Sequence, residues 1–382
     1  MTSPPAVRGP ILTVTLNLAL DVTYVADGVD WDGVNRVRTV HRRAGGKGVN
    51  VARVLAALGR DVLVTGLSGG PNGRAVEADL AAAGLPAALT PIAAESRSTL
   101  AVCDLGPAPS GTAARRTALF NEPGPAVTGE ELGRFLRDYE TRLGRAGAVV
   151  ISGSLPRGVP AAFYAELATL ARRRGVPAIV DADGEPLRHA PAGRPSIVKP
   201  NAEELARALA AQEDSPRDPG ELARALAAQE DSPRDPGELA RALAVQADGP
   251  RDPGENPAGP GTGPVAGPRG HGETFAGAEA LRRGGAEAVV VSLGAGGLLA
   301  VTPEGAWRAA MPYRVEGNPT GAGDALVAGL ALGLVEGTPW PERLRRAAAL
   351  GAAAVAAPVA GDFDRETFQR IHPEIVVEPA RP

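Results

Sequence analysis

Short apolar runs alternate with helix-like periodicity along most of the chain. A strand is predicted over Ile11–Leu16, and a helix over Val49–Leu58 follows it, with apolar side chains on one face. The same alternation predicts further strands over Val62–Leu67, Ala148–Ser152, Ala178–Asp181, Ile197–Lys199 and Ala288–Leu293, and helices over Arg74–Ala83, Leu132–Leu143, Ala161–Arg174, from Gly321 and from Glu342. Such alternation is typical of an open parallel sheet covered by helices on both faces. It therefore predicts a three-layer α/β/α fold with a mostly parallel central sheet, within one domain over residues 1–382.

Glycine-rich and polar motifs follow several of these predicted elements. Examples are Gly45–Gly48, Lys199–Asn201 and Ser292–Gly294. In open parallel sheets, ligands bind beyond the carboxyl ends of the strands. We therefore expect these motifs to line one site.

Two segments interrupt the alternation. Residues 22–43 and 99–120 carry short β-type stretches with scattered charges. They predict a small β-sheet that projects from the main body as a lid.

An internal repeat also interrupts the pattern. Glu204–Gly220 recurs without change as Glu221–Gly237 and with three changes as Glu238–Gly254, before a Gly/Pro-rich tract. Each unit has about eight helix-favouring residues, and helices this short are marginal alone. We interpret residues from about 212 to 272 as a duplicated, mobile surface insertion; a partner-binding arm and a stacked solenoid remain alternatives.

Composition excludes several classes of protein. Hydrophobic residues make up 44% of the 382 residues, enough for a core, and the formal net charge of −4 gives no electrostatic case for binding nucleic acid. Cys103 is the single cysteine, so no internal disulfide can form, as expected in a reducing compartment. Met1–Pro10 has no signal-peptide core, and Ala347–Ala357 is too short to cross a bilayer. These features predict a cytoplasmic protein that does not bind membranes.

Common nucleotide, zinc and hydrolase motifs do not occur. Gly46–Gly48 is not a P-loop because Ser or Thr does not follow Lys47. The four histidines lack zinc-ligand spacing, and Ser152–Ser154 lacks the nucleophile-elbow glycines.

Gly321–Asp324 opens an apolar helix and is the strongest chemical signal. Small residues at a helix start leave backbone N–H groups accessible, and the helix dipole favours an anion there. Asp324 could take a proton from a hydroxyl group beside that anion site. A purely structural glycine turn is the alternative.

A second glycine-rich start lies at Gly45–Asn50. Gly46 would let a ligand approach the backbone, Lys47 could meet a phosphate and Asn50 could bond a hydroxyl group. The alternative is a tight turn with a surface lysine. Asp21, just beyond the first strand, could hold sugar hydroxyls or cap a turn.

Two further motifs follow later strands. Asn201 and Glu204 have the spacing of a helix-capping box, or could belong to a network around hydrated Mg²⁺. The stretch Ser292–Gly297 could accommodate an adenine nucleotide through Ser292, Gly294 and Gly297, or turn a hairpin.

Together these motifs resemble the PfkB (ribokinase-like) family of carbohydrate kinases, within it the 1-phosphofructokinase and tagatose-6-phosphate kinase branch. The resemblance covers nearly all of the chain outside residues 212–272. It is carried by Thr15–Asp21, Ala44–Arg53, Asn121–Pro125, Ser152–Pro156, Val198–Leu205, Ser292–Gly294 and Gly321–Asp324. It implies a ribokinase-like fold with a small β lid and an ATP- and Mg²⁺-dependent kinase acting on a sugar phosphate. Fructose 1-phosphate is the expected substrate; 6-phosphofructokinase, tagatose-6-phosphate kinase and a non-catalytic sugar-phosphate sensor are the alternatives.

The resemblance also implies roles for individual residues. Asp324 matches the catalytic base, and the anion hole matches Gly321, Ala322 and Gly323. Positions that hold the sugar match Asp21, Gly46 and Asn50, and those that hold its phosphate match Arg36, Lys47 and Arg97. Nucleotide-site positions match Lys199, Asn201, Ser292 and Gly294, and the Mg²⁺-associated glutamate matches Glu204. The lid of this family often supplies a homodimer contact.

Three departures from the family pattern stand near the site. Leu18 replaces a usual proline, Asp183 stands where serine is common, and Pro319 lies just before the Gly-Ala-Gly-Asp motif. Pro319 removes an N–H group near the nucleotide, which weakens the expectation of a K⁺ site.

Overall fold

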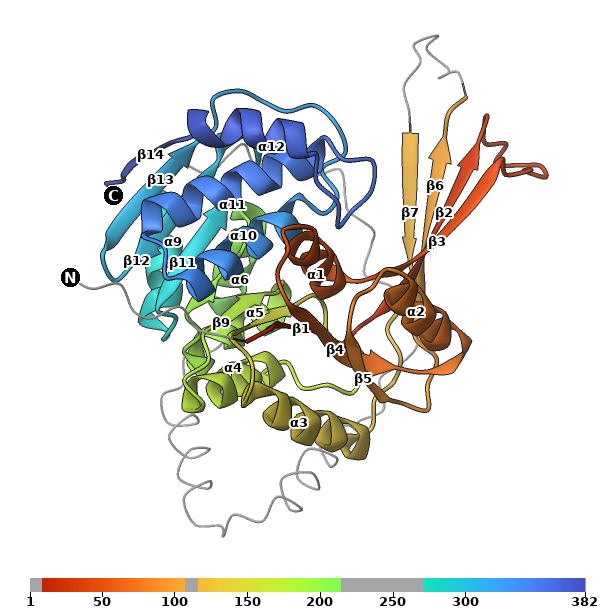
Figure 1. Ribbon diagram of the computed structural model, residues 1–382, viewed down its shortest axis with the longest axis horizontal. Coiled ribbons are helices and arrows are strands. Elements are labelled where there is room, and N and C mark those ends of the chain that lie inside the picture. The colour runs from red at the N-terminus through yellow and green to blue at the C-terminus, as the bar shows by residue number, and fades with distance from the viewer. Residues whose placement is uncertain (1–8, 107–115, 214–270, 382) are drawn as a thin grey trace.

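The central sheet runs through the whole body of the protein. The computed structural model describes residues 9–106, 116–213 and 271–381. Within them, ten strands form one sheet in the order β14-β13-β12-β11-β10-β9-β8-β1-β4-β5 (Figure 1). The strands are β1 (Ile11–Thr15), β4 (Val62–Ser68), β5 (Ala87–Pro91), β8 (Ala148–Ser152), β9 (Ala178–Asp181), β10 (Ile197–Val198), β11 (Ala288–Ser292), β12 (Leu298–Thr302), β13 (Gly305–Ala310) and β14 (Val376–Pro379). Neighbours from β5 to β11 pair in parallel, and β12 to β14 add antiparallel pairs.

Helices cover both faces of this sheet. One layer contains α1 (Lys47–Ala57), α2 (Gly70–Ala82), α10 (Ala322–Glu336), α11 (Trp340–Val355) and α12 (Arg365–Ile371). The other contains α3 (Gly129–Leu143), α4 (Phe163–Arg173), α5 (Gly184–His189), α6 (Ala202–Glu213) and α9 (His271–Arg283). Short 3₁₀ turns are η1 (Ala190–Gly193), η2 (Gly294–Gly296) and η3 (His372–Glu374). The predicted three-layer α/β/α fold is confirmed.

Each face of the sheet contributes to a different core. In β8, Val150 packs with α1 and α10, whereas Val149 and Ile151 pack with α3 and α4. Successive side chains of a strand point to opposite faces, so a fully apolar strand serves both layers. This is why the parallel strands inside the sheet, from β4 to β11, were predictable from short, continuous apolar runs.

The structure differs from the sequence predictions at two kinds of element. Helix α2 begins at Gly70, four residues before the predicted start, because Pro71 occupies the first turn, where its missing N–H group costs nothing. The edge strand β5, helices α5, α9 and α12, and the antiparallel strands β12 to β14 were not predicted. The outermost, β14, is largely exposed and lacks the apolar run of a central strand.

The two interrupting segments form a separate four-stranded sheet, as predicted. Its order is β3-β2-β6-β7, and it stands away from the body in Figure 1. The strands are β2 (Ala19–Ala26), β3 (Thr39–Gly45), β6 (Arg97–Asp104) and β7 (Arg116–Asn121). They extend a few residues beyond the predicted bounds toward the body, so the lid is rooted in the central domain.

The predicted insertion lies almost wholly outside the described residues, which omit 214–270. Helix α6 precedes this gap and α9 follows it. Among the described helices, none combines the length and apolarity needed to cross a membrane.

Candidate active site

The proposed catalytic groups converge where several elements end. Strand β9 lies between β8 and β10 in the sheet, and its last residue is Asp181. Helix α1 packs against β1 and β8, and helix α10 packs against α1, β8 and β9. The starts of both helices therefore meet the carboxyl ends of the central strands, as expected for ligand sites in such sheets.

Asp324 is the third residue of α10 and is only 6% exposed. Its Oδ2 accepts a hydrogen bond of 2.8 Å from Nδ2 of Asn50, in α1. Burial raises the pKa of Asp324 to about 7, and the nearby Asp181 carboxylate adds to the rise; the Asn50 hydrogen bond opposes it most, followed by Lys47 and Lys199. A carboxyl group with this pKa can exist in either protonation state at neutral pH, as a general base requires.

Two lysines flank the buried Asp181. The Nζ of Lys199 lies 3.1 Å from Asp181 Oδ1, and the Nζ of Lys47 lies 3.6 Å from Oδ2. Ser152 Oγ donates to Asp181 Oδ2 at 2.9 Å. Burial works to raise the pKa of Asp181, but Lys199 and Lys47 outweigh it and hold that pKa below its ordinary value. Asp181 is thus an ionised anchor that positions two ammonium groups.

The two ammonium groups differ in their access to solvent. The side chain of Lys199 is 4% exposed, whereas that of Lys47 is 40% exposed. Asp181 raises the pKa of Lys47 against the opposing effect of burial, and Glu204 and Asp324 add to the rise. Lys47 is therefore charged at neutral pH and accessible at the mouth of the site, where it could meet a phosphate.

Sequence reasoning did not select Asp181 as a site residue. One signal was available. Asp181 is the last residue of an apolar strand, Ala178–Asp181, whose bounds were predicted correctly. A carboxylate at the carboxyl end of a central parallel strand lies where ligands bind.

The turn before α10 depends on glycine. Gly321 has φ 87°, and a Cβ atom there would lie 2.9 Å from Cα of Ala360, so a side chain would be both strained and crowded. Ala322 N donates to Pro319 O at 3.1 Å. Within the described residues, the amides of Gly321, Gly323 and Asp324 have no such backbone acceptor. The amides open to an anion are therefore those of Gly321, Gly323 and Asp324 more than that of Ala322.

The proposed sugar-binding residues lie at the base of the lid. Burial raises the pKa of Asp21, in β2, to about 6, with Arg97 as the largest opposing influence. Arg97 Nε donates to Asn17 O at 3.3 Å, and its Nη1 donates to Thr99 Oγ1 at 3.1 Å. Gly46, with φ 112°, is the N-cap of α1 and leads directly into Lys47. Asp21 and Arg97 are thus neighbours, as the substrate-binding prediction needs.

Arg36 does not join this group. It lies exposed between β2 and β3 and makes no hydrogen bond or ion pair with another described residue. Of the three basic residues predicted to hold a phosphate, Lys47 begins α1 in the body, Arg97 begins lid strand β6 at the base of the lid, and Arg36 lies farther along the lid, between β2 and β3.

The predicted nucleotide residues occupy neighbouring strand ends. Asn201 forms a parallel bridge with Ser292 at the end of β11. The residues from Ser292 to Gly297, including Gly294, turn the chain between β11 and the antiparallel β12, so the hairpin interpretation is confirmed. This does not test the nucleotide interpretation.

Asn201 and Glu204 form a reciprocal cap at the start of α6. Asn201 N donates to Glu204 Oε2, and Glu204 N donates to Asn201 Oδ1, each at 2.8 Å. The capping interpretation is therefore confirmed. Among the described residues, no group of three or more His, Cys, Asp or Glu side chains gathers to hold a metal. Mg²⁺ commonly binds with substrate phosphates, water and one or two carboxylates, so the nearby Asp181 and Glu204 remain chemically suitable.

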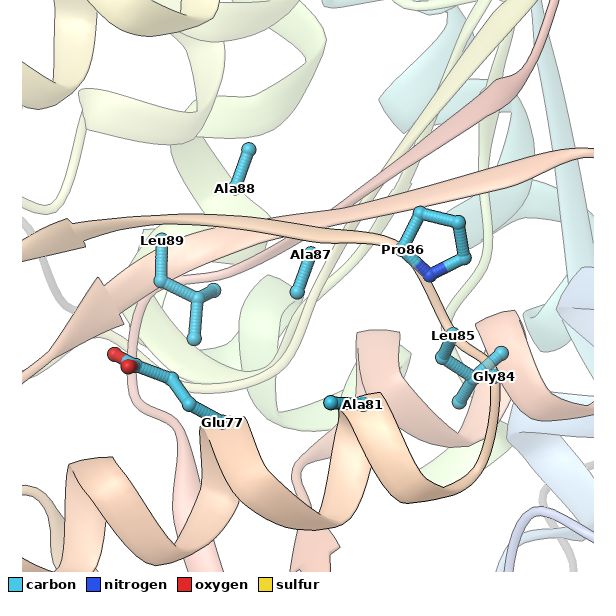
Figure 2. A pocket seen from close by; sticks show the side chains of 8 residues that line it. All are labelled: Glu77, Ala81, Gly84, Leu85, Pro86, Ala87, Ala88 and Leu89. Carbon is cyan, nitrogen blue, oxygen red and sulfur yellow. The ribbon is translucent and has the colours of Figure 1, made fainter.

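A surface pocket elsewhere is separate from this site. It has a volume of about 570 Å³ and lies between α2 and β5 (Figure 2). It is lined by Glu77, Ala81, Gly84, Leu85, Pro86, Ala87, Ala88 and Leu89. Strands β4, β1 and β8 lie between β5 and β9, which carries Asp181. This pocket therefore contains none of the proposed catalytic groups.

Comparison with known proteins agrees with the fold and the motifs. The sequence matches the pfkB family of carbohydrate kinases over residues 15–232 and 271–366. Among solved structures, phosphofructokinase-2 from Escherichia coli in complex with fructose-6-phosphate has a TM-score of 0.70 at 26% identity, covering 96% of this chain and 99% of that chain. A protein from Thermotoga maritima described as a possible 1-phosphofructokinase has a TM-score of 0.69 at 24% identity, with coverage of 97% and 99%. Arabidopsis thaliana ribokinase has a TM-score of 0.58 at 18% identity, with coverage of 96% and 99%, which shows a shared fold.

Proposed function

This chain belongs to the pfkB family of carbohydrate kinases, and from that premise we propose that it transfers the terminal phosphoryl group of ATP to a hydroxyl group of a sugar phosphate. The observation that carries the proposal is the buried Asp324 carboxyl group at the start of α10, bonded to Asn50 and close to two lysines. A carboxylate in that setting combines a base with an electropositive surrounding, which phosphoryl transfer needs.

The proposed reaction is a single displacement. The sugar hydroxyl oxygen forms a bond to the terminal phosphorus, the bond between that phosphorus and the ADP oxygen breaks, and the hydroxyl proton passes to Asp324. The amides of Gly321, Gly323 and Asp324 would hold the transferring group, helped by the N-terminal dipole of α10. Lys47, accessible at the mouth of the site, would hold the phosphate group that the sugar substrate already carries.

Nucleotide residues are proposed along β10 and β11. Lys199, Asn201, Ser292, Gly294 and Gly297 would hold ATP; they lie on neighbouring strand ends and on the turn after β11. When bound, Mg²⁺ would neutralise charge on the phosphates. We assign Glu204 to its hydration network, because one Glu204 oxygen caps α6 and the side chain is near enough to Lys47 to affect its pKa.

Fructose 1-phosphate is the proposed substrate, and the product would be fructose 1,6-bisphosphate. Support comes from the sequence motifs shared with the 1-phosphofructokinase branch and from Lys47 and Arg97 at the base of the lid. Arg36 could contribute only if the lid segment that carries it folds over the substrate. The 26% identity to the E. coli phosphofructokinase-2 favours fructose 6-phosphate as the alternative; tagatose 6-phosphate is a third candidate.

A substrate panel tests this proposal. Steady-state kcat/KM should be highest for fructose 1-phosphate among fructose 1-phosphate, fructose 6-phosphate, tagatose 6-phosphate and unphosphorylated fructose. Arg97→Ala should raise KM more than it lowers kcat, because a contact with a non-reacting phosphate binds ground and transition states alike. Preference for unphosphorylated fructose would refute the phosphate site. Sugar-phosphate binding without ADP release would instead identify a sensor.

We also propose that the lid contacts a second copy of this chain. Large apolar side chains are exposed on it: Trp31 (70%), Val34 (86%), Leu119 (55%) and Phe120 (49%). The E. coli phosphofructokinase-2 has a tetrameric inhibited form. Light scattering of the purified protein checks this assignment.

We place the reaction in the cytoplasm, where ATP is available and a lone cysteine stays reduced.

A further inference from the structure

Two arginines and two aspartates form a network where the lid joins the body. We call Arg43, Arg53, Asp79 and Asp362 the lid-base network. Arg53 Nη2, in α1, lies 2.5 Å from Asp79 Oδ2, in α2. Arg43 Nη2, in β3, lies 2.7 Å from Asp362 Oδ1, in the segment after α11. The two guanidinium groups are close enough for Arg43 to lower the pKa of Arg53, after burial as the larger cause.

The two halves of the network join different parts of the molecule. Asp79 Oδ2 also accepts Ala44 N at 2.9 Å, so this half ties the end of β3 to α1 and α2. Arg43 Nη1 also donates to Ala360 O at 3.1 Å. The second half therefore ties the lid strand to a segment more than 300 residues later in the chain.

That later segment contacts the catalytic groups directly. A Cβ atom on Gly321 would lie 2.9 Å from Ala360 Cα, and one on Gly361 would lie 3.1 Å from Asn50 Oδ1. Gly321 forms the turn before Asp324, and Asn50 donates to Asp324. The backbone at 360 and 361 thus packs against both supports of the proposed base.

The other end of the connection lies beside the proposed sugar site. Arg43 is the cross-strand partner of Asp21 in the β2–β3 pair. Arg43 also lowers the pKa of Asp21, so the two side chains influence each other. A sugar held by Asp21 would therefore act on the strand that carries Arg43.

We propose that Arg43 and Asp362 are positioning residues that hold segment 360–362 against Gly321 and Asn50, and so couple the base of the lid to the phosphoryl-transfer site. The coupling to catalysis rests on the proposed kinase function. The packing that it requires does not, and can be tested separately.

This role is separable from a structural one. The Arg43 and Asp362 side chains are 28% and 46% exposed, and ion pairs exposed to this degree contribute little to stability. A displacement of about 1 Å in a catalytic group can lower a rate by as much as about 100-fold. Loss of the pair should therefore lower kcat markedly while leaving the melting temperature nearly unchanged.

The test compares Asp362→Asn with Glu342→Gln. Glu342, at the start of α11, forms a similarly exposed pair with Arg345 at 2.7 Å and also lies 3.2 Å from Nε2 of His372. Asp362→Asn should lower kcat by about 10-fold, within the range for a displaced catalytic group, with a smaller change in KM for the sugar phosphate. It should also shift the acid side of the pH–rate profile upward, because a loosened Asn50 donor stabilises ionised Asp324 less. Glu342→Gln should leave both unchanged.

Hydrogen exchange supplies a readout that does not depend on activity. Asp362→Asn should speed amide exchange at residues 321–324 and 47–50 without altering exchange in the core strands. The swapped pair Arg43→Asp with Asp362→Arg should restore slow exchange. If Asp362→Asn changed neither amide exchange nor kcat, the inference would be overturned, even if the wild-type protein proved to be an active kinase. If Asp362→Asn fails to fold, Arg43→Lys provides the same comparison. Faster exchange in Asp362→Asn, in a protein whose wild type is inactive on every sugar phosphate, would keep the packing role of the pair and refute the proposed sugar-phosphate kinase function.

Discussion

The starts of α10 and α6 both carry an acidic residue at the third position, yet the two carboxyl groups are used differently. At α6, Glu204 and Asn201 cap each other through two hydrogen bonds of 2.8 Å. At α10, the N-cap is Gly321, which has no side chain to offer, and Asp324 is held instead by Asn50 from another helix.

This difference determines what each carboxyl group can do. A carboxylate bonded to its own helix start stabilises that start, typically by about 1 kcal/mol. Asp324 is buried beside another carboxylate, and its pKa is raised to about 7. A group for which the ionised form is costly accepts a proton readily. The α10 start is therefore suited to chemistry, and the α6 start to stability.

Replacing Asp324 should remove the catalytic role that we assign to the start of α10. We expect Asp324→Asn to lower kcat by about 10²–10⁴, the range for loss of a general base, while sugar-phosphate binding persists. Stopped-flow or steady-state assays measure the first, and calorimetry measures the second. A variant that retains more than half of the wild-type kcat would contradict the assignment.

The same variant should remain folded. Because the folded pKa of Asp324 lies above its ordinary value of 3.8, the carboxyl group favours the folded state most at low pH. That contribution is lost as pH rises through about 7. The neutral asparagine escapes this loss, so Asp324→Asn should melt no lower than the wild type at pH 8.

Replacing the α6 glutamate sharpens the comparison. We expect Glu204→Gln to lower kcat/KM for Mg-ATP by about 10-fold, the low end for an outer-sphere partner of a metal, because glutamine can still cap Asn201 but carries no charge. Glu131→Gln is the control. Glu131 caps α3 in the same way with Thr128 and also accepts Ala93 N. Glu131→Gln should therefore lower the melting temperature without lowering kcat/KM for Mg-ATP. If the two variants had equal kcat/KM, Glu204 would serve only as a helix cap.

The repeat offers the smallest expected effect. Glu221 and Glu238 copy Glu204, but neither has an asparagine three residues before it. Deleting Glu221–Gly254 should leave kcat within about twofold and stability no lower, since loop closure costs only about 0.6 kcal/mol per doubling of length. Thermal melts and assays of the shortened chain check this. Loss of activity in a folded deletion variant would show that the repeat contributes to catalysis or substrate binding.

The sequence predicted the layers and several turns and caps of the candidate site because those features are local. Ala148–Ser152 and Ala178–Asp181 are the clearest cases, since both strands were predicted with their observed bounds from continuous apolar runs. The Gly321 turn and the α6 cap also depend on adjacent residues. Asp181 was missed as an anchor because its partners, Lys47 and Lys199, are not its neighbours in the sequence.

Long-range features set the limit of that prediction. The position of Arg36 depends on how the lid stands relative to the body, which no local pattern encodes. The Arg43–Asp362 pair joins residues separated by 319 positions. The edge strand β14 pairs with β13 while remaining largely exposed, so it lacks the apolar run that reveals a central strand.

The pH dependence of kcat/KM tests the central claim most directly, because it reports the ionisation of the free enzyme. Asp324 acts as a base only when ionised, so kcat/KM for the sugar phosphate should rise with pH through a midpoint near pH 7 and then level off. The residual activity of Asp324→Asn should lack the step near pH 7, and any remaining change near pH 6 belongs to Asp21, whose pKa is about 6, and to the substrate's own phosphate. A wild-type profile that stays flat between pH 5 and pH 9, or the same step in Asp324→Asn, would contradict the account.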